Sequence, residues 1–174
     1  MLQWLKDVIR PIRRQDQRFG PMRYLRDTRT WEGWTEFSPV KGNVEVLLSG
    51  GPEGPTENQR QFIELLESRY PALVSEVRAH PMEAAAAQPN INGDAVRFTL
   101  VAVDLPAEVT DDMSWELCYE TEPKSWCFAV QMRGWMPRSV SVECWQPVVH
   151  VWRRTETGEA PRRQGATTEN TGSI

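Results

Sequence analysis

The sequence predicts an α+β fold: an antiparallel sheet of about seven strands, with two or three helices inserted after the third strand. Two observations predict it. Segments whose apolar and polar residues alternate with a period of two lie on both sides of one stretch with helical spacing. Clusters of Gly, Pro, Asn and Asp separate these segments, as turns require. The chain of 174 residues suits a single domain, which we expect at residues 19–152.

Three alternating segments precede the helical stretch, at residues 19–25, 31–37 and 43–48. Turn residues separate them, so they predict a meander of three antiparallel strands. In the second segment the alternation places Trp31 and Phe37 on one face and Trp34 on the other. This pattern is typical of a sheet with one buried face.

A Gly- and Pro-rich loop at residues 49–55 leads into the helical stretch. Thr56 and Gln59 match a capping box, so a helix is predicted to begin there. Backbone amides at such a helix start can attract phosphate, but the loop lacks the Gly-Lys-Ser/Thr ending of a P-loop, and Glu53 and Glu57 would repel an anion. A capped turn is the simpler interpretation.

Apolar residues at helical spacing continue this helix as far as Tyr70. Because proline lacks the N–H that a helix interior needs, Pro71 is expected to end the helix or to begin the next one. A second helix is predicted toward Pro81, and residues 84–87 add a further turn.

Four more strands are predicted after the helices, at residues 95–104, 115–121, 126–133 and 138–145. The short connection at residues 122–125 predicts a hairpin between the middle two. The pattern leaves open whether the two groups of strands join one sheet.

The two ends of the chain differ from the centre. Residues 1–18 are basic, and apolar residues at helical spacing before Pro11 predict a short amphipathic helix. Such a helix either docks on the domain or makes weak peripheral contact with a membrane through residues 1–14. Residues 153–174 have the polar composition of a disordered tail.

Composition excludes several classes of protein. No segment approaches the roughly 20 apolar residues of a membrane span, and no secretory signal pattern is present, so a cytoplasmic protein is expected. The net charge is −4 and the pI about 5.3, whereas nucleic-acid-binding domains are usually basic, so no nucleic-acid partner is expected.

No motif for catalysis, metal or cofactor emerges. His80 and His150 are the only histidines, and neither has a Cys, His or Asp partner at ligand spacing. A Gly-x-Ser-x-Gly nucleophile motif is also missing from the sequence. We therefore predict no catalytic, metal-binding or cofactor-binding residues.

The three cysteines are expected to be reduced. Cys118 and Cys127 belong to the two strands of the predicted hairpin, on the face opposite its aromatic residues, and a turn centred near Pro123 would place them almost directly opposite each other. A cross-strand disulfide or a paired-thiol sensor is one interpretation, and two small buried side chains the more usual one. Cys144 is expected in the core.

The second half of the chain carries a set of acidic residues that could face a partner: Asp111, Asp112, Glu116, Glu120 and Glu122. They could act as general acids and bases, as a docking surface, or simply as a solvated strand face. Docking is the preferred functional hypothesis because acidic clusters attract cationic partners without precise geometry. Trp34, predicted to be exposed, joins them as a candidate partner-binding residue.

A strand with Trp31-Glu32-Gly33 and a helix entrance with Gly54-Pro55-Thr56-Glu57-x-Gln59-Arg60 resemble a family of uncharacterised bacterial domains of unknown function. The resemblance covers roughly residues 19–143 and brings no catalytic residues. Domains of this type are similar to small immunity or accessory proteins found among bacterial toxin-immunity and defence genes. This similarity implies binding to another protein, such as a toxin or a complex component.

The sequence hypothesis is thus a non-enzymatic protein-binding domain that contacts its partner through an acidic, Trp-rich surface. The alternative is a small enzyme or ligand-binding domain with a pocket between the sheet and the helices.

Overall fold

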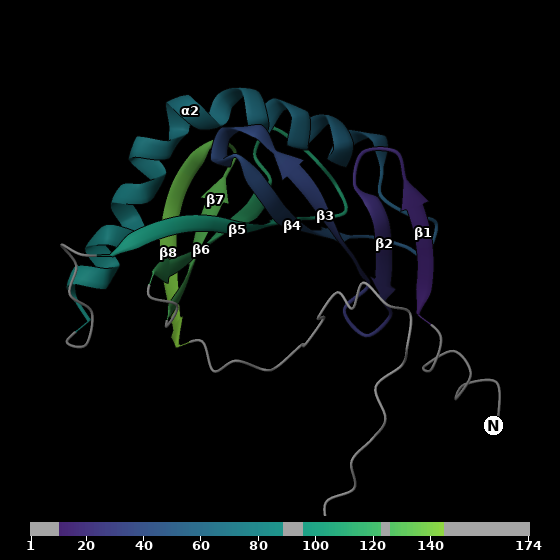
Figure 1. Cartoon of the computed structure of the whole chain (residues 1–174). Coiled ribbons are helices and arrows are strands. Elements are labelled where there is room, and N and C mark those ends of the chain that lie inside the picture. The colour runs from purple at the N-terminus through teal and green to yellow at the C-terminus, as the bar shows by residue number, and fades with distance from the viewer. Residues whose placement is uncertain (1–10, 89–95, 123–125, 145–174) are drawn as a thin grey trace, which may run out of the picture.

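The computed structural model describes residues 11–88, 96–122 and 126–144, which form one sheet of eight strands crossed by one long helix (Figure 1). The order of the strands across the sheet is their order in the chain. All neighbours are antiparallel except β4 and β5, which are parallel and are connected through the helix.

The first half of the chain contributes four strands and a short 3₁₀ helix: β1 (Ile12–Asp16), β2 (Gly20–Leu25), β3 (Thr30–Phe37), η1 (Ser38–Val40) and β4 (Gly42–Ser49). The predicted strands of this half are confirmed to within a residue or two. β1 was not predicted, because Ile12 fits the helical spacing of the N-terminal segment and the three residues after it are polar and exposed. The helix expected before Pro11 lies outside the described residues.

The second half contributes β5 (Arg97–Leu105), β6 (Ser114–Glu122), β7 (Trp126–Arg133) and β8 (Met136–Cys144). β5 lies beside β4, with Val46 opposite Val103 and Leu48 opposite Leu105, so both groups of strands belong to one sheet. The sheet breaks its register between Leu100 and Ala102 and again near Met132, as β-bulges do.

A single helix, α2 (Glu57–Ala86), replaces the two or three helices predicted from the sequence. Both Pro71 and Pro81 lie inside it, so the expectation that Pro71 would end the first helix was wrong. The helix passes through Pro71 because residues on both sides, including Tyr70 and Val77, are buried against the same sheet. In Figure 1 the helix arches over the sheet, and a proline, which removes one backbone hydrogen bond, is a known cause of such a bend.

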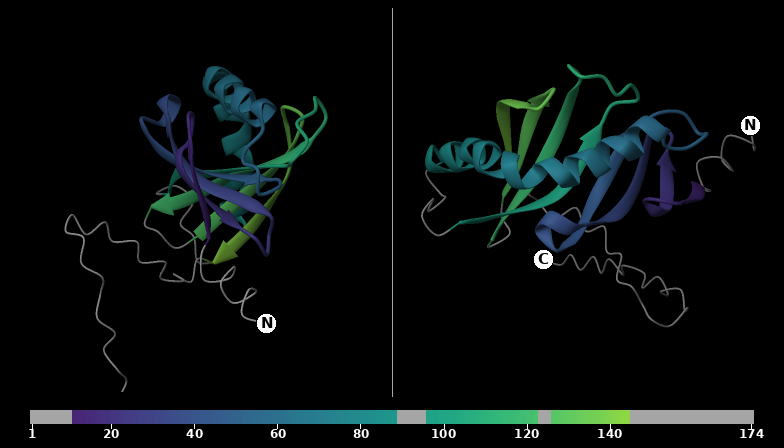
Figure 2. Two further views of the ribbon diagram at one scale, coloured as in Figure 1. Left: turned by 90° about the vertical axis from the view of Figure 1, so that its right-hand side faces the viewer. Right: turned by 90° about the horizontal axis from the view of Figure 1, so that it is seen from above.

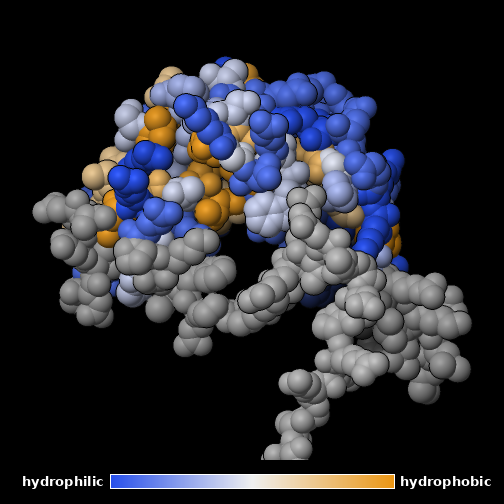
Figure 3. All heavy atoms as spheres, viewed as in Figure 1, coloured by the Kyte–Doolittle hydropathy of each residue, from blue (hydrophilic) through white to orange (hydrophobic). Residues whose placement is uncertain are grey.

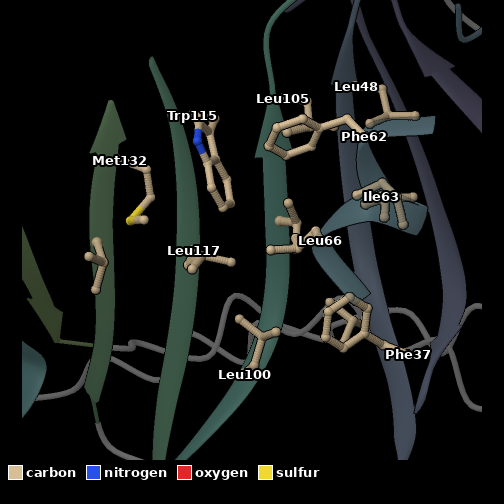
Figure 4. Packing of buried hydrophobic residues seen from close by; sticks show 14 of the residues in the cluster. Phe37, Leu48, Phe62, Ile63, Leu66, Leu100, Leu105, Trp115, Leu117 and Met132 are labelled. Atoms are coloured by element: carbon tan, nitrogen blue, oxygen red, sulfur yellow. The ribbon is translucent and has the colours of Figure 1, made fainter. Parts of the chain in front are cut away.

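The sheet curves around this helix. The left view of Figure 2 shows the two ends of the sheet rising on either side of α2, so that the helix lies in a trough. The core fills the space between them, and Figure 4 shows side chains from the helix and from both halves of the sheet. Figure 3 shows hydrophobic residues in the middle of the molecule, below a helix whose outer side is mainly hydrophilic.

The predicted fold class therefore needs correction in its numbers: the described residues form eight strands and one α-helix, and this helix follows the fourth strand. The antiparallel description also needs one exception, the β4–β5 pair. Within the described residues, α2 covers one face of the sheet and no helix or strand covers the other. We call this second face the open face.

Candidate functional site

The structure divides the six candidate partner-binding residues between two places. Strands β3 and β6 carry Trp34, Glu116, Glu120 and Glu122, whose positions alternate with the buried residues of those strands and therefore lie on the open face. The other two, Asp111 and Asp112, lie in the loop between β5 and β6. The structure thus brings the first group together on one face of the sheet and places Asp111 and Asp112 in a loop apart from it.

The alternation of the strands gives the open face an acidic character. Its charged and reactive side chains on β2 to β7 are Arg23, Glu32, Glu36, Glu45, Arg97, Asp104, Glu116, Cys118, Glu120, Glu122, Cys127 and Arg133. The set contains three arginines. Arg23 donates hydrogen bonds to Glu32, one of them 2.8 Å long from Nε, and Arg97 lies opposite Glu122. Carboxylates dominate the rest of the set, so the open face is negative.

Trp34 is the most exposed aromatic side chain of the described residues, with 57% of its surface accessible. It lies directly opposite Glu45 in the β3–β4 pair, and Glu32 and Glu36 are its neighbours along the same face of β3. The acidic face thus contains an exposed indole. Exposed large aromatic residues mark interaction surfaces more often than isolated aliphatic ones do.

Two carboxyl groups of the open face have raised pKa values. Burial, followed by the neighbouring Glu32, raises the pKa of Glu45 to about 7, although Arg23 opposes the shift. Burial, followed by the charge of Glu116, raises the pKa of Asp104 to about 6. In both groups burial is the largest cause and a neighbouring carboxylate adds to it, so the charged form of each group is unfavourable. A cation placed on this face would reduce that unfavourable energy.

The two cysteines of the predicted hairpin share the open face, as expected, but their register was wrong. Cys118 lies opposite Ala129 and Cys127 opposite Glu120, so the thiols form a diagonal pair. Cys127 therefore lies two residues along β7 from the position opposite Cys118, whereas the prediction placed the two cysteines almost directly opposite each other. The thiols are hydrogen-bonded, and this contact, burial and Glu116 together raise the pKa of Cys118. The side chain of Cys144 lies outside the described part.

The loop before α2 forms the capped helix start that the sequence predicted. Thr56 Oγ1 accepts a hydrogen bond from the Gln59 backbone at 3.2 Å, and the Thr56 backbone donates to Gln59 Oε1 at 2.9 Å. The Gln59 side chain also donates to the carbonyl oxygens of Ser49 and Pro106, at 2.9 and 2.8 Å. These hydrogen bonds already satisfy polar groups at the start of the helix. The structure therefore gives no reason to assign a phosphate-binding site there.

A buried ion pair beside this loop was not predicted. Asp16 is 4% exposed, and Arg60 donates to it at 2.8 Å, while the backbone amides of Arg18 and Phe19 donate to the same carboxylate. Burial acts to raise the pKa of Asp16, but these hydrogen bonds outweigh burial and the pKa is lowered. The pair fastens β1 and its turn to α2. No pattern in the sequence connects residues 44 positions apart.

A small hollow lies on the helix side of the sheet, where α2, the loop between β5 and β6, and the turn between β7 and β8 meet. Its volume is about 210 Å³. Its lining residues are Asn58, Gln61, Phe62, Leu65, Val109, Thr110, Asp111, Gly134 and Trp135. Three distant parts of the chain form it, which explains why sequence analysis did not find it.

Trp135 is the centre of an aromatic cluster beside this hollow. Its ring stacks on Phe62, with centroids 4.9 Å apart, and meets Trp115 edge to face at 5.8 Å. The guanidinium of Arg69 lies over the ring of Trp135, 4.6 Å from its centroid. The residues of the cluster come from α2, β6 and the β7–β8 turn, and they fix the position of that turn.

The described residues contain no group of three or more His, Cys, Asp or Glu that could hold a metal ion. In the same residues, no helix is both long enough and apolar enough to cross a membrane.

Comparison with known proteins gives no assignment: no family model, no curated protein and no solved structure matches the chain.

Proposed function

We propose that this protein is a non-enzymatic binding protein that contacts another protein through the acidic open face and the exposed indole of Trp34. The observation that carries the proposal is the combination of this indole, 57% exposed, with a strand face on which carboxylates outnumber arginines and give a negative charge. A partner with a basic surface would neutralise that charge and cover the indole.

The sheet itself favours a protein partner over a small substrate. The open face is formed by strands rather than by a pocket, and the hollow found in the described residues lies on the other side of the sheet. In line with the resemblance described above, we propose that the partner is a toxin or a component of a defence complex, and that the two meet in the cytoplasm.

The test compares capture of partners from the source cells by the full chain and by two matched variants. The first combines Trp34→Ser with Glu116→Gln and Glu120→Gln on the open face. The control combines Met82→Ser with Glu64→Gln and Glu83→Gln, which are exposed residues of α2. Both variants remove one exposed apolar side chain and two charges.

We expect a basic protein to bind the unaltered chain and the α2 control, to be released at high salt, and to be lost from the open-face variant. The proposal is rejected if no specific protein is retained at low salt, or if the open-face variant and the control retain it equally. Mass spectrometry identifies the captured protein, and a purified pair then gives the affinity.

A further inference from the structure

The hollow beside Trp135 has the lining of a site for one basic side chain. We propose that it binds a single arginine or lysine side chain of a polypeptide partner. The proposal concerns the helix side of the sheet and therefore does not depend on the open face.

The floor and one wall of the hollow are apolar. Phe62, 7% exposed, lies at its base, stacked on Trp135, and Leu65 and Val109 complete the apolar part of the lining. Leu65 keeps 41% of its surface exposed although it belongs to the helix that covers the core. Such a lining suits the methylene stem of a long basic side chain, which packs on apolar surface while its charged head reaches polar groups.

The polar part of the lining accepts hydrogen bonds and is negative. Asp111 is exposed at the rim, and the described residues include no ion-pair partner for it. The side-chain amides of Asn58 and Gln61 add two more oxygen acceptors. By contrast, the neighbouring Asp112 already accepts from Thr110 at 3.3 Å and lies 3.6 Å from Arg133. The unpaired carboxylate of Asp111 is therefore the group that a cationic head would contact.

Arg69 shows that the aromatic cluster already binds a guanidinium. The guanidinium of Arg69 lies over the ring of Trp135, but Arg69 is not among the residues that line the hollow. The indole ring therefore already has a positive charge next to it. A cation over the face of an indole ring is attracted by it even at an exposed site. Removing the positive charge of Arg69 should therefore favour a basic ligand, both by relieving repulsion and by freeing the ring.

The hollow is held in shape before any ligand arrives. Gly134 has φ +54°, and a Cβ there would lie 2.7 Å from the carbonyl oxygen of Asp111. Its backbone N–H donates to Met113 at 2.9 Å, and its carbonyl accepts from Trp115 Nε1 at 2.5 Å. These contacts join the β7–β8 turn to the loop that carries Asp111. A preformed site avoids part of the ordering cost of binding.

A polypeptide is a better source of the basic group than a free amino acid. The volume of about 210 Å³ accommodates roughly one side chain, and the lining contains no basic residue for a ligand's α-carboxylate. A free arginine would bring that carboxylate close to Asp111 and Asp112. A residue within a chain has no such charge.

The test uses the full chain and N-acetyl-arginine N-methylamide as the probe. Amide and indole resonances are followed by two-dimensional nitrogen–proton NMR, with the Trp135 indole assigned through Trp135→Phe. We expect a saturable shift of that resonance. We also expect weaker binding of the neutral, equally shaped citrulline derivative, and of free arginine.

Three substitutions decide whether the site is the one proposed. Asp111→Asn should weaken binding about three- to fivefold, the size of an exposed ion pair. Asp112→Asn is the matched control and should leave the affinity unchanged, because Asp112 is outside the lining. Arg69→Gln should strengthen binding.

The proposal is overturned if the probe gives no saturable shift of Trp135, if the citrulline derivative binds equally well, or if Asp111→Asn and Asp112→Asn behave alike. Preferential binding of benzoate that depends on Arg69 would also overturn it, since the hollow would then be an anion site. The open-face variant described above should bind the probe normally, so that failure here and failure of the proposed function are separate results.

Discussion

At the scale of single residues, Gln59 connects three parts of the chain through its buried side chain. It is 1% exposed, and its side chain forms hydrogen bonds to Thr56, Ser49 and Pro106. It therefore joins the start of α2 to the ends of β4 and β5. The sequence predicted its part in the capping box, which is a local pattern. Its bond to Pro106, 47 residues away, could not be predicted because it depends on how the strands pair.

Substitution of the two capping residues should separate these roles. Thr56→Ala should lower the free energy of unfolding by about 1 kcal/mol, the usual cost of a lost N-cap. Gln59→Ala should cost more, since it also leaves the partly buried carbonyls of Ser49 and Pro106 without their donor. Urea denaturation of both variants measures the difference. Equal losses would mean that the two carbonyl contacts contribute nothing.

The carboxyl group of Glu45 should make stability depend on pH. Its pKa is raised to about 7 by burial and by Glu32. The folded state then holds a proton that the unfolded state releases near pH 4.5, so stability falls as pH rises from about 4.5 to about 7. Glu45→Gln removes this effect, and we expect it to raise the melting temperature at pH 8 and to change it little below pH 4.5.

Glu36→Gln is the control for this experiment, because Glu36 is an exposed carboxylate on the neighbouring strand. It should shift the melting temperature little at either pH. An equal rise of the melting temperature in both variants at pH 8 would mean that the effect comes from the overall charge of the face and not from Glu45.

At the scale of elements, the strands were predicted well because their alternation is a local signal that burial on one face enforces. The helix was predicted in pieces because proline is locally unfavourable in a helix interior, and the sequence does not show what lies beneath it. Residues from Phe62 to Ala85 are buried at helical spacing on the same sheet. Tertiary packing therefore keeps α2 continuous through Pro71.

This interpretation predicts the effect of replacing Pro71. The residue is exposed on the outer side of α2, so Pro71→Ala creates no cavity and restores a backbone hydrogen-bond donor. We expect a gain in unfolding free energy, at most the roughly 3 kcal/mol that separates Ala from Pro in a helix. Chemical denaturation measures it. A loss of stability would show instead that the sheet requires the bend at Pro71.

At the scale of the molecule, the two groups of strands form one structural unit. The β4–β5 pair joins them, and α2 packs on both. In Figure 4, the side chains near the join come from α2, from the first half and from the second half: Phe62, Ile63, Leu66, Phe37, Leu48, Leu105 and Trp115. The sequence left this junction undecided because both strands at the join are apolar on the core face. Their residue patterns do not show which strand pairs with which.

A single core predicts a single unfolding transition. Leu66 is fully buried, and Leu66→Ala should cost about 2–5 kcal/mol. Hydrogen exchange followed by mass spectrometry should show β3 and β7 losing protection at the same denaturant concentration in this variant. Persistence of protection in one half alone would mean that the halves are separate cooperative units.

The functional surfaces differ in how far the sequence reveals them. Alternation identified Trp34, Glu116 and Glu120 correctly as outward-facing, because a strand needs no partner to define its two faces. The hollow was not found, since Phe62, Asp111 and Trp135 come together only when three separate elements pack. Local patterns therefore indicate sheet faces and not pockets.

The agreement between strand order and chain order has a consequence for the folding reaction. Every strand pairing except β4–β5 joins segments that are close in the chain, so most of the sheet can form by rapid, local hairpin closure. The pairing of β4 with β5 instead joins two strands that are separated in the chain by the whole of α2, so it forms later. That step closes the largest loop, and we infer that it limits the folding rate. During synthesis, the ribosome would release four paired strands whose apolar face stays exposed until α2 emerges.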